Sequence, residues 1–347
     1  MKYQRIVAPL LVSGATGLLV GCGSTSVTPA PKTTAAEASP STTLARVPGS
    51  WYFKTGATAY RVEWGANVPA GAPGLTTLLH TGMGLSVAPG GQFFLGSSDK
   101  ATVIYTSDGR SLRSYPSADQ FVWGSDGAHL CRMRTVAGRL TASILAAPDF
   151  APVSEEVGLP AVHGGTAMLE ACNAGTQRLL VSVNATFAST TASLLVDAKT
   201  GSVIRRATYS EGTVLHVSAS LTRIAANCAQ PGCTSHLFDA TSGASLLDLP
   251  GRQIRAISAD DQEIVTVSVP PATHGGGPPE LSIDDRMVAT DNVVWRASGN
   301  FQGAIPGPPG LGFAVGLGPV NGAIAFDILY VHQDGAVSTV AHQSALL

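Results

Sequence analysis

Short apolar runs separated by turn dipeptides fill the chain from Trp51 onward, and no long segment repeats its apolar residues at the 3.6-residue spacing of a helix. An apolar strand, a turn of small residues and a second strand recur as one unit, which is the pattern of a β-hairpin. The turns of this unit are centred on Gly90, Asp126, Ala174, Ser220 and Asp260. They are separated by 36, 48, 46 and 40 residues, a mean of about 42, which matches the blade length of a propeller built from four-stranded sheets.

A second hairpin follows the first at a variable distance in several units. Its turns carry Asp and Gly within residues 108–109, 197–201, 239–243 and 334–335. These residue types suit tight turns, because glycine adopts positive φ and aspartate bonds to nearby backbone. Two turns per unit predict an all-β fold, a β-propeller of four-stranded antiparallel blades. The length of residues 51–347 gives seven blades, although six or eight also fit. A pair of β-sandwiches is the alternative, but it does not explain the paired turns.

The first unit, Trp51 to Thr81, and the last, Asn300 to Leu347, show the pattern most weakly. We therefore expect the N-terminal segment to complete the last blade and so to close the ring. The paired pattern resembles WD-type and related bacterial propeller repeats across residues 51–345, although no Trp-Asp dipeptide or Gly-His start recurs. This resemblance implies the architecture and no particular activity.

The N-terminus has the organisation of a signal peptide. Lys2 and Arg5 precede an apolar stretch, 6–20, that is too short to span a bilayer comfortably. The stretch ends in Leu19-Val20-Gly21-Cys22, which resembles the lipobox of bacterial lipoproteins: a branched apolar residue three positions before an obligatory cysteine and a small residue directly before it. The resemblance implies cleavage after Gly21 and a lipid anchor on Cys22. An ordinary secretory signal with an incidental cysteine is the alternative.

Residues 23–49 consist almost entirely of Ser, Thr, Ala and Pro, with Lys32, Glu37 and Arg46 as the only charges. Such a segment cannot bury enough apolar surface to fold, so it predicts a disordered spacer. The expected organisation is a lipoprotein signal peptide (1–21), a lipidated cysteine with its tether (22–50) and the propeller domain (51–347). We expect the domain to face the extracytoplasmic side of the cell membrane.

Composition narrows the range of partners. The 21 Lys and Arg residues against 23 Asp and Glu give a formal charge of -2, which argues against a nucleic-acid binder because such proteins need a basic face. Four cysteines remain besides Cys22, an even number that suits an oxidising compartment. Cys228 and Cys233 flank a four-residue turn, and Cys131 and Cys172 fall on neighbouring blades, so we expect these two disulfides. No second spaced pair follows the first to make a zinc site.

Candidate chemistry is sparse. The eight histidines are dispersed and none forms an H-x-x-x-H pair. His163 and His216 fall near blade starts, where inner strands line the central channel and imidazoles could bind a metal or an anion. The competing interpretation is ordinary surface or hydrogen-bonded histidine. Two segments interrupt the regular spacing of the repeat and are candidates for a binding surface. They are 270–279, which contains His274, and 305–319, which contains Phe313.

The acidic clusters Asp260-Asp261-Gln262-Glu263 and Asp284-Asp285 are predicted to be turns and not the paired carboxylates of a hydrolase. No G-x-S-x-G motif occurs. We therefore assign no catalytic, cofactor or metal residue.

The sequence favours a membrane-anchored lipoprotein whose propeller binds a protein, peptide or glycan of the cell envelope. It is expected to be a monomer without a cofactor. One alternative is a propeller enzyme, a lyase or hydrolase, with its site at the channel mouth. Another is a structural component of envelope assembly.

Overall fold

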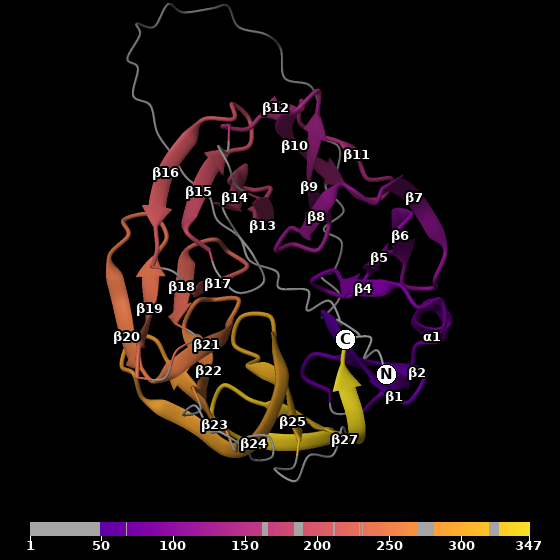
Figure 1. Ribbon diagram of the computed structural model, residues 1–347. Coiled ribbons are helices and arrows are strands. Elements are labelled where there is room, and N and C mark those ends of the chain that lie inside the picture. The colour runs from indigo at the N-terminus through magenta and orange to yellow at the C-terminus, as the bar shows by residue number, and fades with distance from the viewer. Residues whose placement is uncertain are drawn as a thin grey trace, which may run out of the picture.

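The computed structural model describes residues 49–66, 68–161, 166–183, 190–210, 212–228, 230, 232–269, 281–318 and 326–347. Strands dominate these residues, and within them the structure has one α-helix, α1 (Pro73–Leu79). The strands form seven blades arranged as a ring (Figure 1). The predicted all-β propeller of four-stranded blades is confirmed.

Blades 2 to 5 are separate antiparallel sheets, each with its first strand next to the axis of the ring and its last at the rim (Figure 1). Blade 2 contains β4 (Gly84–Val87), β5 (Phe93–Ser97), β6 (Ala101–Thr106) and β7 (Ser111–Pro116), and blade 3 contains β8 (Gln120–Trp123), β9 (His129–Val136), β10 (Arg139–Ala146) and the short β11 (Ala151–Pro152) and β12 (Val157–Gly158). Blade 4 contains β13 (Ala167–Asn173), β14 (Arg178–Val183), β15 (Ala192–Asp197) and β16 (Val203–Thr208). Blade 5 contains β17 (Thr213–Val217), β18 (Arg223–Cys228), β19 (Thr234–Asp239) and β20 (Ser245–Pro250).

Blades 6, 7 and 1 are joined into one continuous sheet by two long strands, β24 and β27. The strands of these blades are β21 (Arg252–Ile257), β22 (Glu263–Ser268), β23 (Leu281–Met287), β24 (Val293–Pro306), β25 (Phe313–Gly318), β26 (Phe326–Val331), β27 (Val337–Leu346), β1 (Ser50–Thr55), β2 (Thr58–Glu63) and β3 (Ala70–Gly71). The first half of β24 is the outer strand of blade 6, and its second half is the innermost strand of blade 7.

The ring closes in the opposite sense from the one expected. The end of β27 pairs with β1, from Ser344 opposite Thr55 to Leu346 opposite Phe53. The C-terminal strand thus supplies the innermost strand of the first blade, and the N-terminal segment does not complete the last one. The physical reason is that β27 runs on from the rim of blade 7 without a turn, as β24 does between blades 6 and 7.

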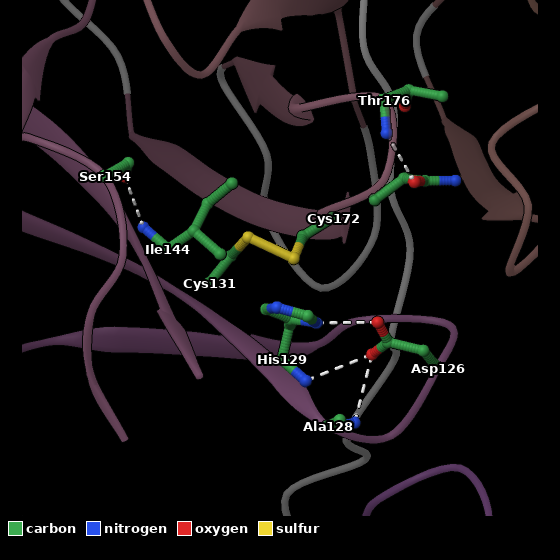
Figure 2. The surroundings of a disulfide bond; sticks show 9 residues. Asp126, Ala128, His129, Cys131, Ile144, Ser154, Cys172 and Thr176 are labelled. Carbon is green, nitrogen blue, oxygen red and sulfur yellow. Dashed lines mark hydrogen bonds and ion pairs between the residues drawn. A yellow bond between two sulfur atoms is a disulfide. The ribbon is translucent and has the colours of Figure 1, made fainter. Parts of the chain in front are cut away.

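Both turns of the repeat are present and lie on one side of the ring, which we call the turn face; the opposite side is the loop face. Aspartates close these turns with their own carboxylates. Asp239 accepts hydrogen bonds from the backbone N–H groups of Thr241 (3.0 Å) and Ser242 (2.8 Å). Asp126 likewise accepts from the N–H groups of Ala128 and His129, both at 3.0 Å (Figure 2).

Burial follows the position of a strand within its blade. The middle strands are buried along almost their whole length, as β22 is, because both faces of each blade pack against neighbouring blades. Outer strands such as β16 alternate or are exposed. The core is therefore a series of apolar layers between blades rather than one central cluster.

Side-chain amides join successive blades at the axis. Asn227 on β18 accepts from the N–H of Ile254 (2.7 Å) and donates to its carbonyl (2.8 Å). Gln120 makes the same pair of bonds to the backbone of β13, and Gln302 to Leu346 at the ring closure. The free edge of an innermost strand otherwise leaves these backbone groups without a strand partner, so the amides satisfy them.

The four cysteines of the body pair as the sequence predicted. Cys131 on β9 and Cys172 on β13 form a disulfide between blades 3 and 4, with Cα atoms 5.9 Å apart (Figure 2). Cys228 and Cys233 form a second one within the β18–β19 hairpin, with Cα atoms 6.0 Å apart. The first crosslink spans two blades and the second only one loop.

Removing the cross-blade disulfide should lower the free energy of unfolding more than removing the local one. The sequence separations are 41 and 5 residues, which in the chain-entropy view correspond to about 4 and about 2 kcal/mol. Guanidinium unfolding of the double variants Cys131→Ala/Cys172→Ala and Cys228→Ala/Cys233→Ala measures both losses against the wild type. An equal loss, or the larger one in the second variant, would contradict the prediction.

Candidate functional site

The innermost strands surround the axis of the ring, where residues from different blades converge (Figure 1). These segments are β4, β8, β13, β17, β21, the second half of β24 and the end of β27. Among the residues described there, four side chains are acidic or basic: Glu170, His216, Arg252 and Arg255. The wall around the axis is therefore mostly uncharged, and its chemistry depends on these four groups.

Two of the four have partners within the protein. Glu170, at a bulge in β13, is 6% exposed and accepts a hydrogen bond from the Ser182 hydroxyl. Burial raises the pKa of Glu170 to about 7, an effect that the Ser182 bond partly offsets. Arg252 contacts the carboxylate of Asp284, with Nη2 3.2 Å from Oδ2, and donates to the Thr266 hydroxyl at 2.9 Å.

His216 and Arg255 lie side by side on adjacent blades. His216 is half-buried on β17, and its ring hydrogen-bonds the backbone of Arg255 on β21. Burial, and then the positive charge of Arg255, lower the pKa of His216 to about 4, whereas the bond to the backbone opposes this shift. The histidine is therefore neutral at pH 7, when one ring nitrogen carries a proton and the other can only accept a hydrogen bond.

Arg255 occupies a β-bulge, between Ile254 and Ala256, where the register with β22 shifts. Bulges re-aim side chains, and here Arg255 is exposed while both neighbours are buried. The surrounding protein nevertheless removes part of its hydration, which lowers the pKa of its guanidinium.

Asp284 and Asp285 lie in the middle of strand β23 and not in a turn, which corrects the sequence-based expectation. Both are fully buried. The sequence was misleading because two adjacent aspartates are typical of turns, whereas here their side chains point to opposite faces of a buried strand. The surroundings of the two buried carboxyl groups therefore differ, and so do their pKa values.

Asp284 is neutralised by three arginines. Besides Arg252, its oxygens contact Arg286 (Nη2 to Oδ2, 2.9 Å) and Arg296 (Nε to Oδ1, 2.8 Å). Burial alone would raise the pKa of Asp284, but hydrogen bonds from Arg296 and Arg286 and the charge of Arg252 lower it below its usual value. Asp284 is therefore a charged anchor within blade 6.

Asp285 faces blade 7 together with Glu263. It stands opposite Val265, in an apolar layer that includes Ile283 and the blade 7 residue Phe313. Within the described part of the chain, neither oxygen of Asp285 has a hydrogen-bond partner, and Oε1 of Glu263 has none. Burial raises the pKa of Asp285 to about 7; burial and then the charges of Asp285 and Asp260 raise that of Glu263 to about 8.

This carboxylate pair is closed to substrates. Glu263 is 1% exposed and Asp285 is fully buried, so neither can reach a bound molecule from the surface. Asp260 and Asp261, by contrast, occupy the predicted turn. Asp261 there accepts hydrogen bonds from the Ser220 and Thr222 hydroxyls of blade 5.

The remaining candidates of the sequence do not gather with His216. His163 and His274 lie outside the described residues. Phe313 is not on a binding face: it is fully buried on β25 between blades 6 and 7, because the run that contains it is a strand and not a surface insertion. Arg255 was not singled out from the sequence, since a lone arginine in a strand gives no signal until a bulge is seen.

A hollow of about 130 Å³ between blades 4 and 5 is lined by Arg205, Ala207, Thr208, Tyr209, Ile224 and Phe238, and is smaller than pockets that hold ligands, which measure roughly 300–1,000 Å³. No group of three His, Cys, Asp or Glu side chains is placed to hold a metal within the described ranges. Nor does the described part of the chain contain a helix long and apolar enough to cross a membrane.

Comparison with known proteins finds distant similarity to solved structures. No protein-family model matches the chain, and no curated protein matches its sequence. Among solved structures, a chain of the Mitotic Checkpoint Complex is similar over 91% of this chain and 88% of its own, with 12% identity and a TM-score of 0.49. TolB from Acinetobacter baumannii is similar over 72% of this chain and 62% of its own (12%, TM-score 0.45). The Cps50 (Swd1) β-propeller domain of Myceliophteria thermophila is similar over 79% and 94% (12%, TM-score 0.45). The ring of blades described above makes this chain a β-propeller domain.

Proposed function

We propose that this chain is a lipid-anchored, extracytoplasmic β-propeller that binds a protein, peptide or glycan of the cell envelope. The proposal rests on which cysteines are in disulfides and which one is not. All four cysteines of the body are in disulfides, which supports an oxidising compartment. Cys22 is the one cysteine left, and it is the cysteine of the lipobox-like sequence.

The point of chain entry supports an orientation on the membrane. Gly49, the first described residue, lies on the turn face: its carbonyl accepts from Trp64, and it adjoins the turn residue Gly90. A flexible chain as long as residues 23–48 would have a root-mean-square length of roughly 25–30 Å. An anchor on Cys22 would therefore hold the turn face toward the membrane and leave the loop face free for a partner.

An enzyme is the weaker alternative. The paired carboxylates of blade 6 have pKa values suited to acid–base chemistry, yet burial closes them to substrates. Binding needs no such groups, and a rigid disulfide-linked ring presents loops without reorganisation.

The anchor is tested by mass spectrometry of the N-terminus of full-length protein recovered from membranes, beside a Cys22→Ser variant. We expect a diacylglyceryl-modified Cys22 in the wild type, and loss of both the modification and membrane retention in the variant. The variant keeps both body disulfides, so its fold should be unchanged. An unmodified wild-type N-terminus released to the medium would refute the anchor.

Partner binding is tested separately with a photoreactive amino acid in place of Arg139, on the loop face, or of Lys199, on the turn face. Both side chains are exposed. A single crosslinked envelope component from position 139 and none from 199 is the expected result. Crosslinking of equal yield from both positions, or from neither, would refute the proposed binding face.

A further inference from the structure

The hollow between blades 4 and 5 lies beside the outer strand β16 and has a mostly apolar wall. Ile224, Phe238, Tyr209 and Ala207 line it together with Arg205 and Thr208. Thr208 is exposed, so the hollow opens to solvent at the rim of the ring. Its volume of about 130 Å³ is too small for a whole ligand, but a cavity of about 150 Å³ holds a benzene ring. The hollow is therefore of about the size that one aromatic ring needs.

The hollow exists because an alanine occupies a position that is large in two other blades. The bulge between the third and fourth strands defines equivalent positions in blades 2, 4 and 5, which are Tyr115, Ala207 and Leu249. Tyr115 and Leu249 are 9% and 2% exposed, and each belongs to the apolar layer between its own blade and the next one. The methyl group of Ala207 cannot fill the same space.

Blade 2 shows how a tyrosine ring is held at this position. The Tyr115 hydroxyl donates to the carbonyl of Phe150 in the next blade at 3.1 Å, and Cζ of Arg113 lies 5.7 Å from the centroid of the ring, within cation–π range. Nη1 of Arg113 donates to the same carbonyl at 3.2 Å. In blade 4 the equivalent Arg205 repeats this last contact, because its Nη1 donates to the carbonyl of Ala240 at 3.1 Å. The cation and the acceptor carbonyl are thus both present in blade 4, whereas Ala207 supplies no ring.

We propose that the hollow binds a tyrosine side chain from an extended segment of a partner polypeptide. This inference rests on the proposed binding function and specifies one contact of the partner. β16 is the last strand of its sheet, and none of the described strands pairs with its outer edge, so an added strand can bond there. A tyrosine of that strand beside Ala207 would enter the hollow.

The match between hollow and ring is electrostatic as well as steric. The guanidinium of Arg205 meets the negative face of the incoming ring. The phenol hydroxyl donates to the carbonyl of Ala240, which keeps a second lone pair beside the bond from Arg205. These are the two contacts that Tyr115 makes within blade 2 and its neighbour.

The experiment follows the δ1-methyl signal of Ile224 by NMR in full-length, isoleucine-labelled protein at a constant detergent concentration. Ile224 lines the hollow and is 4% exposed, and Ile224→Val assigns its signal. The ligands are a short extended peptide with one central tyrosine, the same peptide with alanine there, and p-cresol. We expect saturable ring-current shifts with the tyrosine peptide and with p-cresol but none with the alanine peptide. The dissociation constant of p-cresol should be on the order of 1 mM, and that of the tyrosine peptide at least tenfold lower because backbone pairing adds to it.

Ala207→Leu is the decisive variant, and Ala70→Leu, at an exposed alanine of the outer strand β3, is its matched control. A207L should weaken binding of the tyrosine peptide at least tenfold by filling the hollow, whereas A70L should not change it. Leu249 shows that a leucine fits at this position of a blade, so the methyl signals of isoleucines in other blades should stay unchanged in A207L.

Two results would overturn the inference. Equal binding by A207L and the wild type, or no shift with any ligand, would remove the site. A shift with p-cresol and none with the tyrosine peptide would assign the hollow to a free phenol and refute the polypeptide partner. Neither result changes the crosslink expected from position 139, which tests the proposed function by itself.

Discussion

Asp284→Asn should destabilise the propeller by about 3–5 kcal/mol, the loss expected when one member of a buried ion-pair network is neutralised. The asparagine keeps the size of the side chain but leaves Arg252 and Arg286, both with side chains 14% exposed, beside a neutral group. Arg296 loses less, because its side chain is 60% exposed and can be hydrated in place. The cost therefore comes mainly from Arg252, since Arg286 keeps its contact with Asp291.

The measurement is urea unfolding at neutral pH, followed by tryptophan fluorescence. Asp291→Asn is the matched control: Asp291 also contacts Arg286, at 2.6 Å, but its side chain is 47% exposed. Exposed pairs contribute less than about 1 kcal/mol, so D291N should unfold almost as the wild type does. A loss below 1 kcal/mol in D284N would mean that water enters blade 6 and hydrates the arginines.

The repeat was readable from the sequence because turns depend on local chemistry. Asp and Gly at fixed offsets close each hairpin whatever surrounds it, as Asp239 does in blade 5. Blade number and the cross-blade disulfide followed from that spacing. The direction of ring closure did not, because it depends on pairing between β27 and β1 across the whole chain.

The roles of the charged residues at the axis and in blade 6 could not be predicted from the sequence, for a different reason. Whether Asp284 and Asp285 are turn residues or buried strand residues is decided by the arginines and apolar blades around them, which come from distant segments. Arg255 is distinguished only by its bulge and by the absence of an acidic partner among the described residues. Such features arise from tertiary packing and leave no local pattern.

The buried acids of blade 6 should make the protein less stable as the pH rises. Their folded-state pKa values, about 8 for Glu263 and about 7 for Asp285, lie above the ordinary carboxylate range. Once the pH exceeds about 4, the unfolded chain releases these protons while the folded protein keeps them. The free energy of unfolding then falls by about 1.4 kcal/mol per pH unit for each retained proton, until the pH passes the folded pKa.

Two other titratable groups determine the pH range in which the measurement is made. His216, with a pKa near 4, acts in the opposite direction between about pH 4 and 6.5, because there the unfolded chain binds the additional proton. Glu170, with a pKa of about 7, acts in the same direction as the blade 6 pair. Between pH 6.5 and 8 the contribution of the histidine falls toward zero, so the fall in stability there comes mainly from the buried acids.

The double variant Glu263→Gln/Asp285→Asn tests this origin. The amides keep the volume of both side chains and do not titrate, so between pH 6.5 and pH 8 the variant should gain on the order of 3 kcal/mol relative to the wild type. Urea unfolding from pH 6.5 to 8 measures both slopes, and Glu170→Gln separates the contribution of blade 4. A wild-type profile that is flat over this window, or one that the double variant reproduces, would mean that both carboxylates are ionised in the folded protein and that a counter-charge or water reaches them between blades 6 and 7.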